Sequence, residues 1–161
     1  MVETTRKNKS RNNGKKYPGK YLKGLSSKKQ TLRKKEINKF GALSWKNAAA
    51  YVGFKTDKGV KTKSSKYTRN WKSVFPEAKS LEEKAAATGV PLNYIKQCYN
   101  RGLAAWRTGH RPGATQQQWG YGRVHSFLLC GKTYYSTDSD LVSKARSSSS
   151  SADKWWSKTC Q

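Results

Sequence analysis

Acidic residues are scarce in this sequence of 161 residues. Nine Asp and Glu stand against 34 Lys and Arg, so the formal net charge is +25 at pH 7. Self-repulsion of this size disfavours an isolated compact chain and favours a partner that supplies negative charge. Nucleic acid, an acidic protein surface and an anionic membrane all meet that need.

Long apolar runs are missing as well. No stretch approaches the roughly 18 apolar residues of a membrane-spanning helix, and the basic N-terminus lacks the apolar region of a signal peptide. We therefore expect no membrane span and a protein that stays in the compartment where it is made. Hydrophobic residues make up 34% of the chain, below the roughly 45–50% of average globular proteins. The 6 Trp, 9 Tyr and 4 Phe nevertheless predict a small aromatic core.

Cysteine is sparse too. Cys98, Cys130 and Cys160 are too few and too scattered for a disulfide framework, and a reducing cytosol is the simplest explanation. We expect Cys98 to be a small core residue and Cys160 a free thiol at a frayed end. Together with His110 and His125, the cysteines match no usual short zinc-ligand spacing. We expect neither a metal nor a cofactor.

Signatures of catalysis are weak. The sequence has no GxxxxGK[ST] phosphate loop, and nine acids supply a two-carboxylate mechanism poorly. For hydrolysis by a Cys–His pair, Asp138 and Asp140 are the candidate orienting acids, and only their proximity in the sequence indicates them. We expect a protein that is not an enzyme and takes no small-molecule substrate.

The positive charge is concentrated near the N-terminus. Residues 1–43 hold 14 Lys and Arg and 2 acids, a net charge of +12. We interpret this range as an extended basic arm, with a merely solvated tail as the alternative. Rings and lysines alternate at 17–22, which predicts a partner-binding segment of Tyr17, Tyr21 and Leu22. The expected polyanion-binding residues of the arm are Arg6, Lys7, Lys9, Arg11, Lys15 and Lys16.

Helical periodicity predicts a mainly α fold. Ser26 or Ser27 can begin a helix to about Phe40, but its apolar stripe is thin, so it needs a partner surface. Residues 44–79 predict short helices around a Lys/Gly/Ser loop, the first of them capped by Ser44. Residues 80–146 predict a compact helical core module.

Within the core module, two capping boxes are expected to open helices, at Ser80 with Glu83 and at Thr115 with Gln118. Trp106 and Trp119 are expected to lie inside this module. Residues 133–136 are expected to be extended, and Asp138 to cap a last helix. Residues 147–161 are interpreted as a serine-rich tether that ends in a partner-binding pair, Trp155 and Trp156.

The helix pair around Gly89 resembles a helix-turn-helix, in which a second helix enters a DNA groove. The alternative is an ordinary αα-corner in a helical core. The motif positions are Ala85, Gly89, Ile95 and Cys98, and the groove-facing candidates are Asn93, Lys96, Gln97, Asn100 and Arg101.

Arginines and aromatic rings gather between residues 101 and 127. Arginine can stack on a ring while its fork contacts a carboxylate or a phosphate. Two roles are therefore possible for these arginines: they form an anion-binding pocket at the start of the Trp119 helix, or they link neighbouring helices to one another. The candidates are Arg101, Arg107, Arg111 and Arg123, beside Trp106, Trp119 and Tyr121.

Three segments, YPGKYLKGLSSKKQ, FKTDKGVKTKSSKYT and NRGLAAWRTGHRPGATQQQWGYGRVHSFL, resemble an uncharacterised family encoded by large DNA viruses of algae and protists. Chlorella viruses carry close relatives, and phages carry similar versions of the last segment. The resemblance implies no activity and no catalytic residue, but it implies a component of the virion. We therefore expect a minor capsid protein that cements larger shell proteins, with viral capsid proteins as its partners. The alternative is a viral DNA-binding protein on the packaged genome.

Deleting residues 1–43 is expected to flatten the salt dependence of DNA affinity, because fewer counterions are released when fewer cations meet phosphates. The measurement is the slope of log affinity against log salt concentration. An unchanged slope would show that the affinity comes from elsewhere in the chain.

Overall fold

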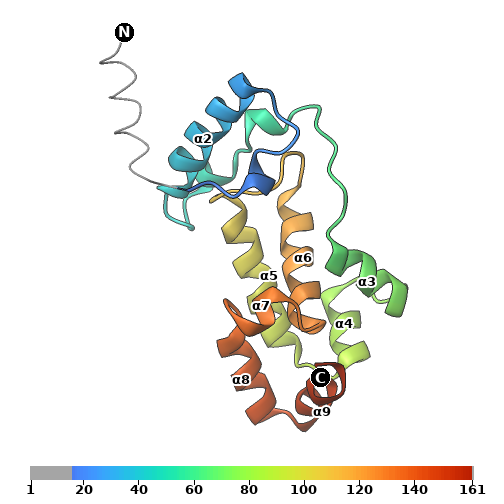
Figure 1. Ribbon diagram of the computed structural model, residues 1–161. Helices are drawn as coiled ribbons and strands as arrows, with labels where there is room; N and C mark the ends of the chain where they lie inside the picture. Colours follow the sequence, from blue (N-terminus) through green and yellow to red (C-terminus); the bar gives the residue numbers. More distant parts are fainter. Residues whose placement is uncertain (1–15, 161) are drawn as a thin grey trace.

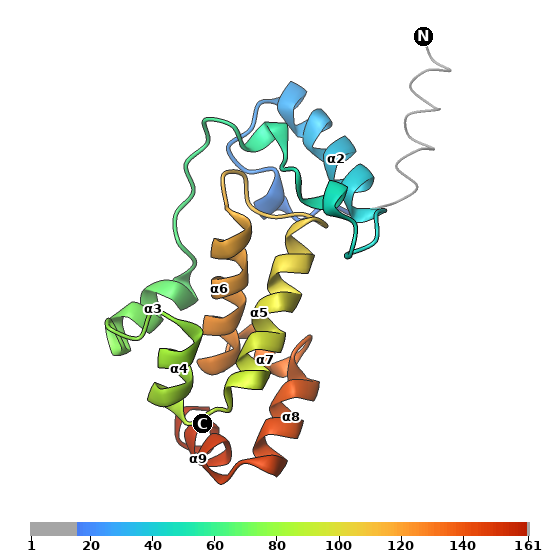
Figure 2. The same ribbon diagram turned by 180° about the vertical axis from the view of Figure 1, so that it is seen from behind.

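The computed structural model describes residues 16–160 (Figure 1). All regular secondary structure within that range is helical, which confirms the expected mainly α fold. Two antiparallel helices, α5 (Leu92–Trp106) and α6 (Gln116–Leu128), run along the middle of an elongated molecule. Helix α2 (Ser27–Gly41) covers one end of this pair and the C-terminal helices cover the other, as both views show (Figures 1 and 2).

The two central helices touch backbone to backbone. A Cβ atom placed on Gly102 of α5 would stand 2.8 Å from the Cα of Gly120 of α6. Neither position has room for a side chain, because interiors are packed to near-crystalline density. The predicted capping box at the start of α6 is confirmed: the Thr115 hydroxyl accepts the Gln118 N–H, and the Gln118 side chain accepts the Thr115 N–H.

Helix α4 (Leu81–Thr88) joins α5 through the predicted turn. The capping box of Ser80 and Glu83 is confirmed, and Gly89 ends α4 with a left-handed φ of 79°. Such a φ disfavours any side chain, which is why glycine stands there. Helix α3 (Lys66–Val74), begun by the Ser65 hydroxyl, packs beside α6.

The main core joins the middle pair to the C-terminal helices. Cys98 is fully buried, as expected, and Trp106 is buried with its indole N–H donating to the Ala114 carbonyl. Trp119 is only half-buried, so its expected place inside the core is wrong. The fully buried residues of this core include Val90, Ile95, Cys98, Val124, Phe127, Leu128, Leu141 and Trp156.

The C-terminal region is not a tether. Residues 132–159 form α7 (Lys132–Tyr135), α8 (Ser139–Ser148) and α9 (Ser150–Thr159), so both the extended piece and the flexible serine run are wrong. The serine run instead supplies a helix cap, because the Ser149 hydroxyl accepts the Ala152 N–H. Asp138 stands before α8 but makes no cap bond through its side chain.

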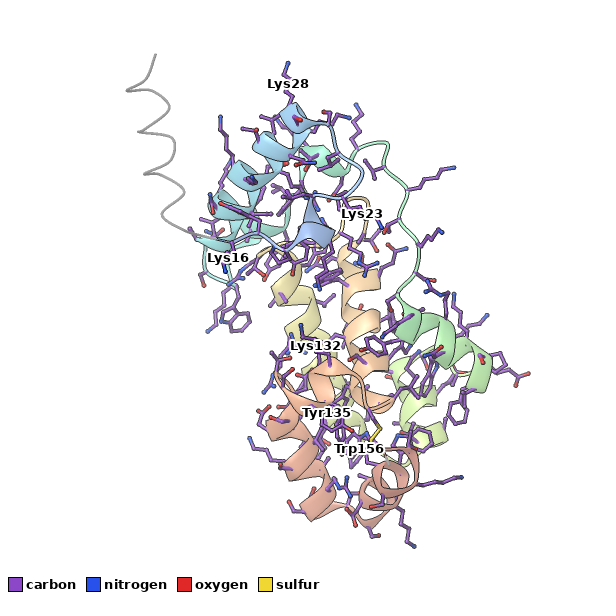
Figure 3. All side chains as sticks on the ribbon, viewed as in Figure 1. Lys16, Lys23, Lys28, Lys132, Tyr135 and Trp156 are labelled. Carbon is purple, nitrogen blue, oxygen red and sulfur yellow. A yellow bond between two sulfur atoms is a disulfide. The ribbon has the colours of Figure 1, made fainter. Side chains whose placement is uncertain are left out.

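The tryptophan pair packs on its own chain. Trp156 has 0% of its surface exposed and donates its indole N–H to the Phe127 carbonyl, and it points into the molecule (Figure 3). Trp155 donates to the Leu128 carbonyl at 2.8 Å. The expectation that Trp156 binds a partner is therefore wrong. Trp155 is half-buried, so partner binding by its exposed part stays a prediction.

A disulfide joins Cys130 to Cys160, 30 residues apart, and ties the end of α9 to the turn after α6. The small number and wide scatter of the cysteines argued against disulfide bonding, and that interpretation is wrong for Cys130 and Cys160. The expected free thiol at Cys160 is wrong, because the docking of α9 brings the two Cα atoms within 5.5 Å.

The N-terminal lobe is folded too. Ser26 caps α2 by accepting the Lys29 N–H. Ile37, Phe40 and Phe54 form a second small core beside the 3₁₀ turns η1 (Gly19–Tyr21), η2 (Ala48–Tyr51) and η3 (Lys55–Asp57). The expected α-helical turns after Ser44 are therefore 3₁₀ turns.

Residues 16–43 are thus not an extended arm, and the surface that α2 needs comes from the same chain. Residues 1–15 lie outside the described range. A deletion of residues 1–43 would remove α2 along with the charge, so a truncation that tests the arm alone has to end at residue 15.

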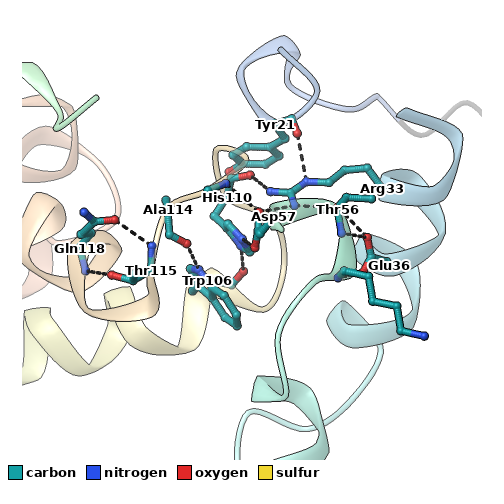
Figure 4. A network of polar contacts seen from close by, with 12 residues as sticks. Tyr21, Arg33, Glu36, Thr56, Asp57, Trp106, His110, Ala114, Thr115 and Gln118 are labelled. Atoms are coloured by element: carbon teal, nitrogen blue, oxygen red, sulfur yellow. Dashed lines mark hydrogen bonds and ion pairs between the residues drawn. The ribbon is translucent and has the colours of Figure 1, made fainter. Parts of the chain in front are cut away.

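A fully buried arginine holds this lobe on the middle pair (Figure 4). The Arg33 side chain, 0% exposed, donates to the Tyr21 carbonyl, the Thr56 hydroxyl and the Asp57 carboxylate, the last at 2.6 Å. It also donates to the His110 carbonyl in the loop between α5 and α6. Every guanidinium nitrogen therefore has a partner, as a buried charge requires.

Asp57 completes the network from the other side. Its carboxylate also accepts from His110 Nε2 at 2.6 Å and from the Gly113 N–H at 2.9 Å. Burial by itself would raise the pKa of Asp57, but the hydrogen bonds from His110 and Gly113 and the charge of Arg33 outweigh it and lower the pKa. The carboxylate therefore stays ionised in the fold and keeps the buried guanidinium paired.

Replacing Asp57 by Asn is expected to lower the free energy of unfolding by about 3–5 kcal/mol, because it leaves a buried guanidinium uncompensated. Asp153→Asn is the matched control. Asp153 is 53% exposed and pairs with Arg146 on the surface, so its loss should cost about 0–1 kcal/mol. Urea unfolding of both variants measures the difference, and equal small losses would show that the network contributes little.

Candidate nucleic-acid interface

A groove of about 1000 Å³ lies along α6. Its lining includes residues of the segment 62–65, α3, α6 and α7. In Figure 1, α3 lies on one side of α6 and α7 on the other. Residues of η1 and of the loop before α6 contribute to the same groove. The walls thus come from parts of the chain that are far apart in sequence.

The charged side chains that line the groove are all basic. No Asp or Glu is found among its lining residues. The basic residues are Lys20, Lys63, Lys72, Lys79, Lys84, Arg111, Arg123 and Lys132, of which Lys132 is visible beside α7 (Figure 3).

Most carboxylates of the described chain already contact groups of the same chain. The ion pairs among residues 16–160 join Asp to Arg or His, and none of them uses a lysine. Glu36 accepts backbone N–H groups of Lys55 and Thr56, and Glu83 completes the capping box of α4. Lysine charge is therefore left without carboxylate partners, and it faces the solvent and the groove.

Aromatic rings alternate with the cations in this groove. Trp119 is half-buried, with the Tyr21 ring edge-on at 6.1 Å and Lys20 Nζ 5.7 Å from its centroid. Tyr121 is half-buried beside Tyr99. The aromatic residues of the lining are Tyr21, Tyr67, Trp71, Phe75, Trp119 and Tyr121. Cations with flat rings suit a ligand that has both phosphates and bases.

The four arginines between residues 101 and 123 have different partners in the structure. Arg101 grips Asp140 through two bonds of 2.8 and 2.7 Å, and Arg123 grips the fully buried Asp138 through bonds of 2.9 and 2.8 Å. These two arginines are staples between elements, so their predicted role as free polyanion binders is wrong. The same contacts explain why the Asp138 carboxylate does not cap α8.

The other two arginines differ from these. Arg107 is half-buried at the end of α5 and donates to the Ala104 carbonyl. Arg111 is exposed and lines the groove, which agrees with an anion-binding role.

The remaining predicted residues are dispersed. Arg6, Lys7, Lys9, Arg11 and Lys15 lie outside the described residues, while Lys16 is exposed (Figure 3). Tyr17 exchanges a hydrogen bond with Asn38, and the Tyr21 ring lies against Gly109. Leu22 is half-buried. The predicted docking segment therefore packs largely on its own chain, and of its three predicted partner-binding residues only Tyr21 reaches the groove, next to Lys20.

The helix-turn-helix-like pair has its turn and its buried positions as expected, with Ile95 and Cys98 inside. Its candidate DNA-reading residues, Asn93, Lys96, Gln97 and Asn100, are exposed on α5 but do not line the groove. DNA reading by this face stays a prediction.

Sequence reasoning missed most of the groove lysines. Lys63, Lys72 and Lys79 belong to a range that the sequence indicated only as packing helices and a loop. The available signal was the alternation of Lys with Tyr67, Trp71 and Phe75, but periodicity explained those rings as core positions.

Two basic side chains are buried at the bottom of the groove. Burial, followed by the charges of Lys84 and Lys72, lowers the pKa of His125 to about 3. Burial lowers the pKa of the Lys84 ammonium to about 8, although Glu83 acts in the opposite direction. His125 is therefore neutral at neutral pH and Lys84 is largely charged.

His125→Gln is expected to reduce the acid sensitivity of the fold. The pKa of His125 is 6.5 in the unfolded chain and about 3 in the folded chain, so between these pH values only the unfolded chain is protonated at His125. The free energy of unfolding therefore falls as the pH drops through this window. Urea unfolding at several pH values above 3.8, the ordinary value of Asp57, measures the slope. Equal slopes for wild type and variant would contradict this assignment.

Within residues 16–160, no group of three His, Cys, Asp or Glu side chains is arranged to hold a metal ion. No helix in that range is long and apolar enough to cross a membrane.

Comparison with known proteins adds a family. Residues 18–144 match DUF5824, which is described as a family of unknown function. Comparisons with curated proteins and with solved structures gave no match. The matched range contains every residue that lines the groove. Because the match covers most of the chain, this protein belongs to the DUF5824 family.

Proposed function

We propose that this protein is a non-enzymatic binder of nucleic acid and that a single strand lies in the groove along α6. The observation that carries the proposal is the all-basic charge of a groove that also presents half-buried rings. Lysines attract the phosphate backbone without regard to sequence, and each ring offers a stacking platform for a base.

Electrostatics supports this assignment beyond the groove itself. Net charge far above zero raises the local concentration of a polyanion and speeds its association. Among residues 16–160, carboxylates pair with four arginines, Arg33, Arg101, Arg123 and Arg146, and with none of the lysines. A flexible lysine on the surface suits contact with a phosphate as a point charge.

The size of the groove favours one strand over two. A duplex presents its bases inward and is read by a protruding helix that enters its major groove. Here the rings line a hollow of about 1000 Å³, a volume that suits a few nucleotides of a single strand. We expect a duplex to bind more weakly and mainly through surface lysines.

The resemblance to proteins of large DNA viruses suggests the setting of this activity, in which the protein would hold viral nucleic acid. The role as a capsid cement stays a prediction from the resemblance. In the described residues, two segments that this role would offer to shell proteins pack on their own chain instead: Trp156 is buried and α2 is packed.

Replacing Lys72 and Lys132 together by Gln is expected to weaken binding of a fluorescent oligothymidylate and to lower the log–log salt slope by about 1.4. Each single-strand phosphate contact contributes about 0.7 to that slope. Fluorescence anisotropy over a series of salt concentrations measures both effects, and the same titration with a duplex compares the two forms.

The matched control replaces Lys144 and Lys154, which are exposed and do not line the groove. This double variant has the same net charge as the groove variant and should bind almost as the wild type does. Equal losses for the two variants would contradict a groove site and indicate binding by net charge alone. Tighter binding of duplex than of single strand would contradict the assigned ligand.

A further inference from the structure

The bottom of the groove has a buried ammonium without an acidic partner. The Lys84 side chain comes from α4 and is only 2% exposed. Its Nζ donates to the Ala78 carbonyl at 3.1 Å and to the Lys79 carbonyl, and it lies 5.0 Å from the Tyr121 ring centroid and 5.7 Å from that of Trp71. Neutral carbonyls and rings offset part of the cost of burying this charge, but none of them carries a formal negative charge.

A buried imidazole with an unused ring nitrogen faces the same charge. His125 is 4% exposed and lies parallel to the Trp71 ring, with 5.5 Å between centroids. Its Nδ1 is 2.9 Å from the Thr68 hydroxyl, whereas its Nε2 is buried without a hydrogen-bond partner. The positive charges of Lys84 and Lys72 both act on this ring.

A short hydroxyl chain bears on which ring nitrogen holds the proton. The Ser65 hydroxyl donates to the Thr68 hydroxyl at 3.1 Å, which leaves the hydrogen of Thr68 available for His125 Nδ1 at 2.9 Å. A neutral imidazole has one donor and one acceptor nitrogen. When Thr68 donates to Nδ1, the proton of His125 lies on Nε2, which is then a buried donor in need of an acceptor.

We infer that Lys84 and His125 form a subsite for one phosphate group at the bottom of the groove. Both side chains line the groove, and each presents an N–H donor where an oxyanion would be the natural acceptor. A phosphate oxygen would satisfy His125 Nε2 and neutralise the Lys84 ammonium, with Lys72 close enough to add to the field. Charge-assisted hydrogen bonds of this kind are about twice as strong as neutral ones.

The subsite deepens the proposed function, on which it rests for the identity of the ligand. A phosphodiester of a bound strand and a free phosphate ion offer the same oxygens. The competing explanation is structural: Lys84 staples the turn at 78–79 to α4, and His125 only fills the space between aromatic rings. The two explanations differ in how the site responds to phosphate.

The test uses the full-length protein and inorganic phosphate, with the proton resonances of the His125 ring followed by NMR over pH. Bound phosphate should raise the pKa of His125 by about 1 unit or more, because a nearby anion favours the imidazolium. Lys84→Met should weaken phosphate binding about tenfold or more, since it removes a charge-assisted hydrogen bond.

Lys144→Met is the matched control, because it removes the same charge from an exposed residue of α8 that does not line the groove. It should leave phosphate affinity within about twofold of the wild type, as a screened surface charge does. Lys84→Arg keeps the charge and should retain more phosphate affinity than Lys84→Met. Melting temperatures of all variants separate loss of binding from loss of fold.

An unchanged His125 pKa in phosphate, or equal phosphate affinities of the Lys84→Met and Lys144→Met variants, would overturn the subsite. A single strand could still bind in the groove in that case, as the Lys72 and Lys132 double variant would show. A phosphate response at His125 without oligonucleotide binding would support the subsite and contradict the proposed function.

Discussion

The ion pair between Arg33 and Asp57 is the interaction on which the arrangement of this protein depends. Arg33 comes from α2, Asp57 from η3, and their common neighbour His110 from the loop between α5 and α6. Three stretches distant in sequence therefore meet around one buried guanidinium (Figure 4). Such a group tolerates burial only where all its donors are satisfied, so the network specifies one position for the N-terminal lobe.

That position has a direct consequence for the groove. The segment between η3 and α3 leaves the network at one end of the molecule and arrives at α3 near the other (Figure 2). Its path brings residues 62–65 alongside α6, and the lobe itself brings Lys20 and Tyr21 to the groove. A stable contact 53 residues apart in sequence, between Asp57 and His110, thus shapes a surface that neither residue lines.

Arginine and lysine have different roles in this protein, because their side chains differ in shape and hydration. The planar fork of Arg33, Arg101 and Arg123 matches carboxylates inside the fold. Lysines have flexible stems and strongly hydrated heads, and they remain on the surface or in the groove. Among residues 16–160, the positive charge without a carboxylate partner is therefore mostly lysine at the surface and in the groove, which is the form of charge suited to sequence-independent contact with phosphates.

Sequence motifs predicted structure correctly where the structure depends on interactions between near neighbours in the chain. Capping boxes need residues three apart, and a glycine stop needs one residue, so Ser80, Thr115 and Gly89 predicted their helix ends correctly. The serine run misled because composition alone cannot distinguish a tether from a helix cap followed by an apolar face. Ala152 and Trp156 supply that face, four residues apart and both buried.

The sequence by itself determined the helical class, the helix starts and the net charge of this protein, because these follow from near neighbours and from composition. Only the tertiary structure decided which charges are neutralised and which remain free. Asp57 and Asp138 find their arginines 24 and 15 residues away, and the groove collects side chains from Lys20 to Thr137. Contacts between residues so far apart depend on how whole helices pack. The spacing of residues along the chain predicts local helices but does not predict that packing.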